Sequence, residues 1–169
     1  MAVQDAGPTG RRKEHRYREG SKMSRWDRRD RRAHKRIEPG TRTIASMPWK
    51  IAAAFGQMEQ IVTTLQTTGD IDDQGGTAVF QVPSSHEWFE LAPAINGFAE
   101  VYELHAHIAE REMPTAPLRQ LANKFKYGMM IFQSDVDLVR EALATLKAET
   151  RTMNLNYVDA LIQTAAETP

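Results

Sequence analysis

The sequence predicts a mainly α-helical fold: an irregular bundle of about five helices with at most one short strand or ribbon, preceded by a basic, partly disordered N-terminal arm. Two observations lead to this fold class. From residue 47 onward, apolar side chains recur at helical spacing in segments separated by glycine or proline. The first 43 residues lack that pattern and are rich in arginine. We therefore divide the chain into an arm, residues 1–43, and a helical domain, residues 44–169.

The first expected helix begins near Met47, with Ser46 as its cap and Pro48 in its first turn. Gly69 is expected to end it, because glycine readily takes the left-handed conformation that closes helices. The apolar face between these limits consists of Ile51, Phe55, Met58, Val62 and Leu65. This spacing predicts a helix that buries one side.

The second expected helix follows a cap at Ser84 or Ser85 and covers residues 86–112, and Pro93 kinks or divides it. Beyond the proline, one face is formed by Ile95, Phe98, Tyr102 and His105, with Val101 and Ile108 widening it. A face of this width predicts a helix that packs on the core.

Three further helices are expected at 118–132, at 134–150 and around 155–166, with Thr115 and Ser134 capping the first two. Their expected core residues are Leu118, Leu121, Phe125, Met129, Phe132, Val139, Leu143, Leu146, Val158, Leu161 and Ile162. The connections are short, as in helical bundles.

Residues 77–82, TAVFQV, form the one strand that the sequence predicts, because β-branched residues precede the terminating Pro83. A strand needs a hydrogen-bonding partner. It is therefore a small ribbon edge, half of an intersubunit pair, or an extended segment.

Charge is divided unequally between the arm and the helical domain, although the net charge of the chain is zero. Of the 22 Lys+Arg and 22 Asp+Glu, residues 1–43 hold 14 and 6, which leaves 8 and 16 for residues 44–169. The arm thus carries +8 and the domain −8. Such a split favours a tail that binds a polyanion or a partner, and it also fits docking on an acidic face of the same protein or of a sister subunit.

Within the arm, the first ten residues are expected to be disordered, and residues 24–38 are expected to form a helix. Ser24 is a suitable cap with Asp27 three residues later, and Pro39-Gly40 ends the segment. Its cationic face consists of Arg25, Arg28, Arg29, Arg32, Lys35 and Arg36, and a narrow apolar stripe of Trp26, Ala33 and Ile37 runs alongside. A helix this short has only marginal stability on its own in water. We therefore expect it to become ordered when it binds a partner.

Arginine outnumbers lysine in the arm by 11 to 3, which suits phosphate because guanidinium binds bidentately and stacks on bases. Tyr17 and Trp26 add stacking surfaces. The residues expected to contact nucleic acid are Arg11, Arg12, Arg16, Arg18, Arg25, Trp26, Arg28, Arg29, Arg31, Arg32, Lys35 and Arg36. The segment from Arg25 to Arg36 resembles the arginine-rich RNA-binding peptides of lambdoid phage antiterminators, which implies a phage-type regulatory or RNA-binding factor.

The expected partners are nucleic acid, RNA or DNA, together with a protein partner or a second copy of the chain, and no membrane. The alternative is a structural, assembly or adaptor protein whose arm docks on an acidic protein surface. A cytoplasmic protein is expected, because no apolar run approaches the length that spans a bilayer and no secretory signal follows the first charges. The absence of cysteine fits a reducing compartment.

No pattern in the sequence predicts catalysis or a cofactor: GxSxG, Walker A and GxGxxG motifs are absent. His105 and His107 would face about 200° apart on a helix, so they cannot share a metal ion. HEWFE at 86–90 lacks the second histidine of the zinc-binding HExxH pattern. We therefore expect no enzyme, no metal and partly exposed histidines.

The loop at residues 70–76 resembles a calcium loop at Asp70, Asp72 and Gly75, but Gln81 stands where the bidentate glutamate belongs. We interpret the loop as solvated turn chemistry.

Several large apolar residues have two interpretations. Trp49, Trp88 and Phe89 are expected in the core or at an interface. Met129 and Met130 are expected in the core or, as the alternative, in an adaptable binding groove.

Overall fold

The computed structural model describes residues 42–69, 71–82 and 86–167. In these ranges a short 3-10 helix, η1, is followed by five α-helices and three short strands. Their bounds are η1 Ile44–Ser46, α2 Pro48–Thr68, β1 Asp73–Gln74, β2 Thr77–Gln81, β3 Trp88–Glu90, α3 Leu91–Ala109, α4 Ala116–Lys126, α5 Gln133–Thr152 and α6 Leu155–Ala166. The predicted mainly α-helical fold is confirmed. The expected helix at 24–38 and the caps Ser84 and Ser85 lie outside the described residues.

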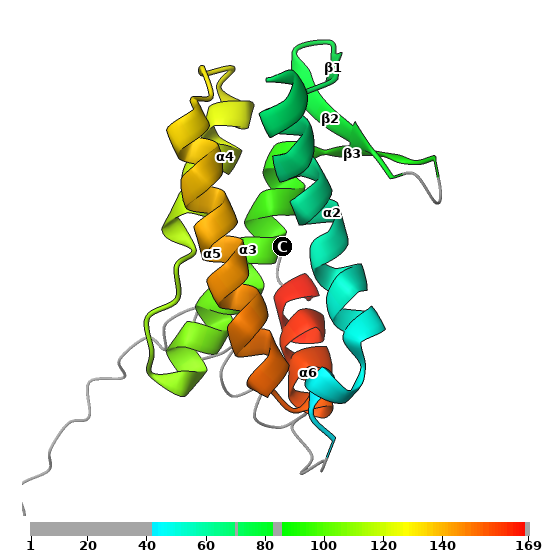
Figure 1. Cartoon of the computed structure of the whole chain (residues 1–169), viewed down its shortest axis with the longest axis vertical. Coiled ribbons are helices and arrows are strands. Elements are labelled where there is room, and N and C mark those ends of the chain that lie inside the picture. Colours follow the sequence, from blue (N-terminus) through cyan, green and yellow to red (C-terminus); the bar gives the residue numbers. More distant parts are fainter. Residues whose placement is uncertain (1–41, 70, 83–85, 168–169) are drawn as a thin grey trace, which may run out of the picture.

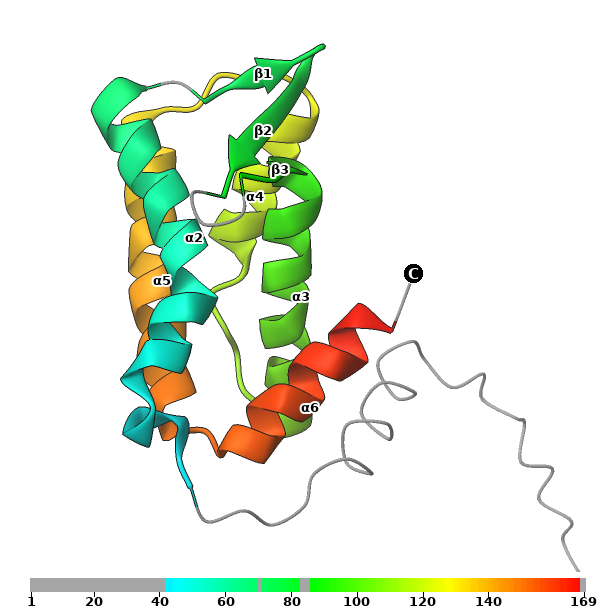
Figure 2. The same ribbon diagram turned by 90° about the vertical axis from the view of Figure 1, so that its right-hand side faces the viewer.

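Three long helices, α2, α3 and α5, run along the long axis of the molecule (Figure 1). The helix α4 packs beside α3 and α5 near one end, where the small sheet also lies, and α6 packs obliquely on α3 at the other end (Figure 2). The first described residues, which lead into η1, lie at the α6 end (Figure 2).

The core forms where the apolar faces of all five helices meet. Phe55, Ile95, Leu104, Leu118 and Leu146 are entirely inaccessible to solvent. Most of the apolar side chains predicted on the helical faces are buried, whereas Met129, Phe132 and Ile162 are exposed, and Leu104, which was not predicted in the core, is fully buried. Arg119 of α4 adds a polar clamp, because its guanidinium donates to both carboxylate oxygens of Glu103 on α3 at 2.7 and 2.6 Å.

The strand predicted at 77–82 is confirmed as β2 and is the central strand of a sheet ordered β1-β2-β3. Gly75 and Gly76, both with positive φ, form the two-residue turn between β1 and β2. The other neighbour, β3, pairs antiparallel with β2 in the register Phe80↔Phe89. Residues 88–90 were expected in a helix, and this was wrong: they add a strand to β2 instead.

Three predicted features of the helix starts were wrong. Pro93 lies in the first turn of α3, where backbone N–H groups need no helical partner, so it neither kinks nor divides the helix. Ser46 does not cap α2; it belongs to η1, and its hydroxyl donates to the Thr43 carbonyl at 2.8 Å. Ser134 does not cap α5, because the helix begins at Gln133 and Phe132 is the capping position.

The end of α4 is six residues earlier than predicted. Gly128 has φ +60°, and its N–H donates to the Phe125 carbonyl at 3.3 Å while the Met129 N–H donates to the Lys124 carbonyl at 2.8 Å. These two bonds form a Schellman motif, which closes a helix. Residues 129–132 therefore lead out of the helix toward α5.

The ends of α2 and α6 agree with the sequence. Gly69 closes α2 in the left-handed conformation, with φ 70°. The last helix has the predicted bounds, with Asn154 capping it by accepting the Asn156 N–H at 2.9 Å. Val158 and Leu161 are buried as expected, but Ile162 is not, because 47% of its surface remains exposed.

Substituting alanine for leucine at two positions of α5 separates core packing from surface exposure. Leu146→Ala removes a side chain with 0% exposure and should lower the free energy of unfolding by about 2–5 kcal/mol. Leu138→Ala changes a side chain that is 48% exposed on the same helix and should cost less than about 1 kcal/mol. Urea denaturation followed by circular dichroism measures both, and equal losses would contradict the assigned core.

Candidate functional site

The twelve arm residues expected to contact nucleic acid, Arg11 to Arg36 with Trp26, lie outside the described residues. The structure instead shows where the arm joins the helical domain. The Arg42 carbonyl accepts the Leu155 N–H at 3.1 Å, Thr43 forms a bridge with Asn154, and the Ile44 N–H donates to the Met153 carbonyl at 3.0 Å. The chain that leads from the arm is thus attached to the junction between α5 and α6.

A buried polar cluster joins α3, α5 and α6 around His105. The Nε2 atom of His105 lies 3.3 Å from a carboxylate oxygen of Glu149, and its Nδ1 lies 2.8 Å from the Tyr157 hydroxyl. Because a carboxylate only accepts, Nε2 carries the proton, and the neutral Nδ1 accepts from Tyr157. The expectation of partly exposed histidines is wrong for His105, whose exposed fraction is 5%.

Burial lowers the pKa of His105 below its ordinary value of 6.5, and this outweighs the opposing effect of Glu149. Tyr157, His105 and Glu149 follow one another in the same order as the nucleophile, the base and the orienting group of a covalent catalytic site, with Tyr157 in the position of the nucleophile. The three side chains line neither of the two grooves described below. We therefore interpret the cluster as a polar contact that fixes three helices relative to one another.

A second buried pair lies one turn away on the same helices. Thr150 donates its hydroxyl proton to the Leu146 carbonyl at 2.7 Å, so the 2.7 Å contact with Tyr102 must use the tyrosine proton. Burial raises the pKa of Tyr102 to about 12, although the hydrogen bond with Thr150 acts in the opposite direction. Each hydroxyl is therefore satisfied within the protein.

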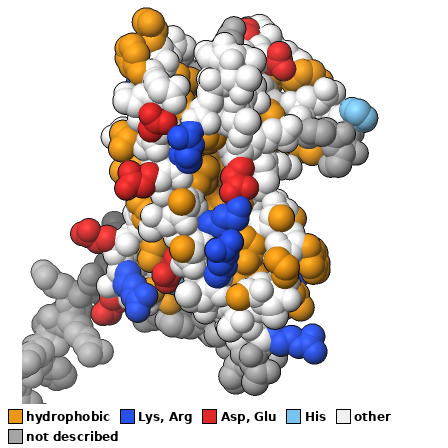
Figure 3. Space-filling view, viewed as in Figure 1, with side chains coloured by type: hydrophobic (Ala, Val, Ile, Leu, Met, Phe, Trp, Pro, Cys, Tyr) orange, Lys and Arg blue, Asp and Glu red, His pale blue; other side chains and the backbone are white. Residues whose placement is uncertain are grey.

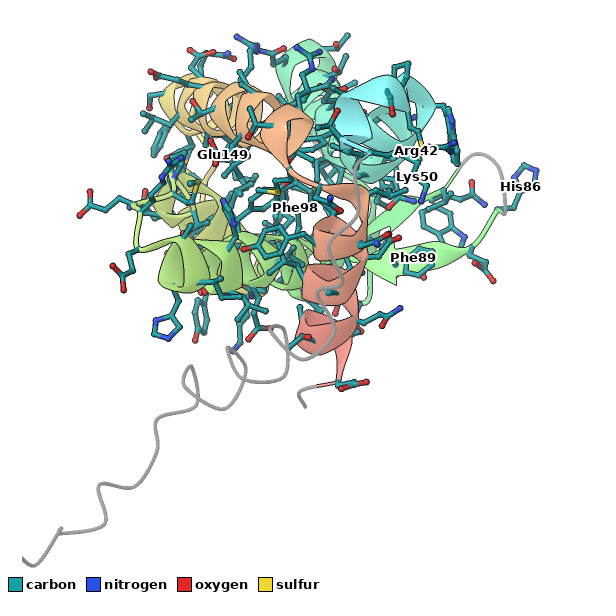
Figure 4. The ribbon with its side chains drawn as sticks, turned by 90° about the horizontal axis from the view of Figure 1, so that it is seen from below. Arg42, Lys50, His86, Phe89, Phe98 and Glu149 are labelled. Carbon is teal, nitrogen blue, oxygen red and sulfur yellow. The ribbon has the colours of Figure 1, made fainter. Side chains whose placement is uncertain are left out.

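Among the described residues, no three histidine or acidic side chains are grouped so that they could hold a metal ion. Figure 4 shows His86 projecting from the tip of the sheet, well away from Glu149 and the cluster at His105. In the loop that superficially resembles a calcium site, Asp73 accepts the Gly76 N–H at 2.8 Å, which is a turn contact. Asp70 lies outside the described residues.

An exposed apolar patch, which we call the α4–α5 patch, consists of Tyr127, Met129, Met130 and Phe132. The expectation that Met129, Met130 and Phe132 are core residues was wrong, and Met130 is 75% exposed. The early end of α4 at Gly128 is the physical reason, because it turns these residues away from the helical face. Figure 3 shows hydrophobic side chains gathered at that end of the molecule, over the loop between α4 and α5.

The α4–α5 patch is held in place by Asp135. Its carboxylate accepts the Phe132 N–H at 2.8 Å and pairs with Lys124 of α4, so the two ends of the loop are joined. These two contacts hold the pKa of Asp135 below its usual value, with the lysine contributing most. A groove of about 380 Å³ adjoins the patch and is lined by Leu65, Ile71, Ala78, Phe125, Met129 and Met130, among others.

Met129 and Met130 at the groove fit the second prediction for these residues, an adaptable binding groove, because methionine side chains are flexible. Trp49, Trp88 and Phe89 are also exposed, so they are not core residues, and their place at an interface stays a prediction. Trp88 and Phe89 lie on the edge strand β3 and are 44% and 47% exposed. Exposed aromatic and methionine side chains of this kind typically mark interaction surfaces.

Comparisons with known proteins give no family assignment: no protein-family model, curated protein or solved structure matches the chain significantly. No helix in the described ranges is both long enough and apolar enough to cross a bilayer. Function is therefore inferred from the residues of this chain.

The stability of the protein should fall as the pH is lowered from about 7.5 to about 5.5. Because burial lowers the pKa of His105, the unfolded chain binds a proton that the folded chain does not, and the loss begins as the pH falls through 6.5. His105→Gln should remove this component of the pH dependence of the urea midpoint. His107→Gln, at an exposed position of the same helix, is the matched control. An unchanged pH dependence in His105→Gln would contradict the assigned protonation.

Proposed function

We propose that the chain is a non-enzymatic nucleic-acid-binding protein whose arginine-rich arm contacts phosphates while the helical body binds a protein partner or a second copy. The observation that carries this proposal is the division of charge, with +8 on residues 1–43 and −8 on residues 44–169. Phosphate contacts dominate nucleic-acid affinity, and arginine is the side chain best suited to them. A cytoplasmic location is part of the same proposal.

The acidic body restricts where nucleic acid can lie. A surface that carries a net −8 repels a phosphate backbone, so the body gains little by approaching it. The arm is attached through residues 42–44 at the α6 end of the body. We infer that the arm is the contact and that the body remains accessible to other partners.

The α4–α5 patch supports the second half of the proposal. Tyr127, Met129, Met130 and Phe132 are each at least half exposed, on a loop that Asp135 fixes at both ends. A preorganised apolar surface loses less conformational entropy on binding than a mobile one. We infer that this patch is where the body meets a protein.

The runner-up is an assembly or adaptor protein whose arm binds an acidic protein surface. The observation that favours it is the −8 charge of the body, since the arm of one copy could bind the body of the next. The two functions make opposite predictions for nucleic acid. In the second, deleting the arm should change the oligomeric mass at low salt and nucleic acid should have no effect, whereas in the first the arm should bind nucleic acid.

Replacing Arg28, Arg29, Arg31 and Arg32 by alanine should weaken nucleic-acid binding at least about 100-fold at moderate salt, because each lost phosphate contact forfeits counterion release. Fluorescence anisotropy with labelled single-stranded RNA, double-stranded RNA and double-stranded DNA, over a salt series, measures both affinity and salt slope. The polymer that binds tightest identifies the class.

The same four arginines changed to lysine form the matched control, because charge is kept and the planar guanidinium is lost. This variant should keep most of the salt slope. Binding that survives both the alanine variant and deletion of residues 1–43 would exclude the arm as the contact. The ratio of absorbance at 260 and 280 nm, before and after nuclease, reports whether nucleic acid co-purifies with the wild type.

Met130→Glu should weaken self-association through the α4–α5 patch at least about tenfold, because a charge would have to be buried in an apolar contact. Sedimentation velocity over a concentration series measures it. Trp49→Glu is the control, since Trp49 is 65% exposed and does not belong to the patch. Equal effects of the two variants would argue against a specific contact at the patch.

A further inference from the structure

A second groove, which we call the α6 groove, lies among α2, α3 and α6 and has a volume of about 400 Å³. Its lining is almost wholly apolar and includes Ile44, Gly97, Val101, Val158, Ile162 and Ala166. Ile162, which a core position would have buried, remains 47% exposed at its edge. The groove therefore offers an apolar surface that the described residues leave uncovered.

The polar atoms beside the α6 groove are already satisfied. Tyr102 and Thr150 line it, but their hydroxyls bond to each other and to the Leu146 carbonyl. Phe98 also lines it, projecting from α3 toward the middle of the molecule beside α6 (Figure 4). An occupant would have to be apolar, because the groove supplies few hydrogen-bonding groups to a polar one.

The arm joins the body at this groove. Ile44 lines it, and the backbone bonds of residues 42–44 to Met153, Asn154 and Leu155 fix the point from which the arm departs. Seven residues separate Ile37 from Ile44, a reach of up to about 25 Å. Since α6 has 12 residues and is about 18 Å long, residues 24–38 can fold back along the whole groove.

The apolar stripe of residues 24–38 matches what the groove needs. Trp26, Ala33 and Ile37 would lie together on one side of the helix, about 115° from the centre of the cationic face. By its position on α6, next to Val158, the acidic residue Asp159 flanks the groove, and its carboxylate lies 3.9 Å from the Lys50 ammonium. An arginine beside the stripe would share this carboxylate with Lys50.

We propose that residues 24–38 dock in the α6 groove of the same chain as a helix, with Trp26 and Ile37 inserted among α2, α3 and α6. Docking orders a segment that is too short to be a stable helix alone, and it turns the cationic face outward. The body thus presents the arginines as one preformed surface. This inference concerns the occupant of the groove and holds whether or not the arginines bind nucleic acid.

Trp26 provides the test, because the chain has three tryptophans and the other two are exposed. In a Trp49→Phe/Trp88→Phe chain, Trp26 is the remaining reporter. Its emission maximum should lie at least about 10 nm below that of the isolated peptide 24–38, and quenching by acrylamide should be at least about twofold weaker, because the indole is desolvated. Emission and quenching equal to those of the peptide would overturn the proposal.

Two glycines give a matched pair for blocking the groove. A Cβ added at Gly97, which lines the groove, or at Gly56, which does not, meets no atom within 4 Å. Gly97→Met should fill the groove and move the emission of Trp26 to that of the peptide, whereas Gly56→Met should leave it unchanged. Circular dichroism checks that both bodies stay folded, and equal shifts from the two variants would overturn the proposal.

A cysteine pair gives a second readout, since the chain has no cysteine of its own. Ile37→Cys/Ile162→Cys should form a disulfide within one chain under mild oxidation, because the bridge requires Cα atoms closer than about 7 Å. Disulfide-linked dimers, or a Trp26 shift that grows with protein concentration, would place the arm on a second copy and overturn docking within the chain.

Chains with alanine at Arg28, Arg29, Arg31 and Arg32 separate the two proposals: they should lose nucleic-acid binding yet keep the blue-shifted emission.

Discussion

The aromatic contact of Phe55 on α2 with Phe98 and Tyr102 on α3 links the core, the buried hydrogen bonds and the α6 groove. Its ring is fully buried, lies edge-on to Phe98 with centroids 5.4 Å apart, and contacts Tyr102 at 6.2 Å. Tyr102 then joins α3 to α5 through Thr150, and Phe98 forms a wall of the groove beside α6. One aromatic cluster thus connects the core, the buried hydrogen bonds and the α6 groove.

The two apolar surfaces lie on different parts of the body: the loop between α4 and α5 is at the end of the long axis where the sheet lies, and α6 lies toward the other end (Figure 1). Their separation means that an arm docked at one end would leave the other end accessible. Asp135 bonds both Lys124 and the Phe132 backbone and so joins the two ends of the loop that carries the patch. Under the two proposals above, the body would bind two partners without competition between them.

Hydrogen bonds between buried polar side chains fix the orientation of the helices relative to one another. His105 contacts Tyr157 on α6 and Glu149 on α5, so a single imidazole orients three helices. Apolar packing alone tolerates small rotations of helices, whereas a hydrogen bond fixes distance and direction. The lowered pKa of His105 is the electrostatic consequence of placing it there.

The sequence by itself determined most of the buried helical faces, the strand β2, the end of α2 at Gly69 and the bounds of α6, because these depend on local periodicity and turn chemistry. It also determined the division of charge, which needs no structure. Only the tertiary structure decided that residues 88–90 pair with β2, that Met129 and Met130 are exposed after Gly128, and that His105 is buried against Glu149. These outcomes depend on partners distant in sequence, which local spacing does not encode.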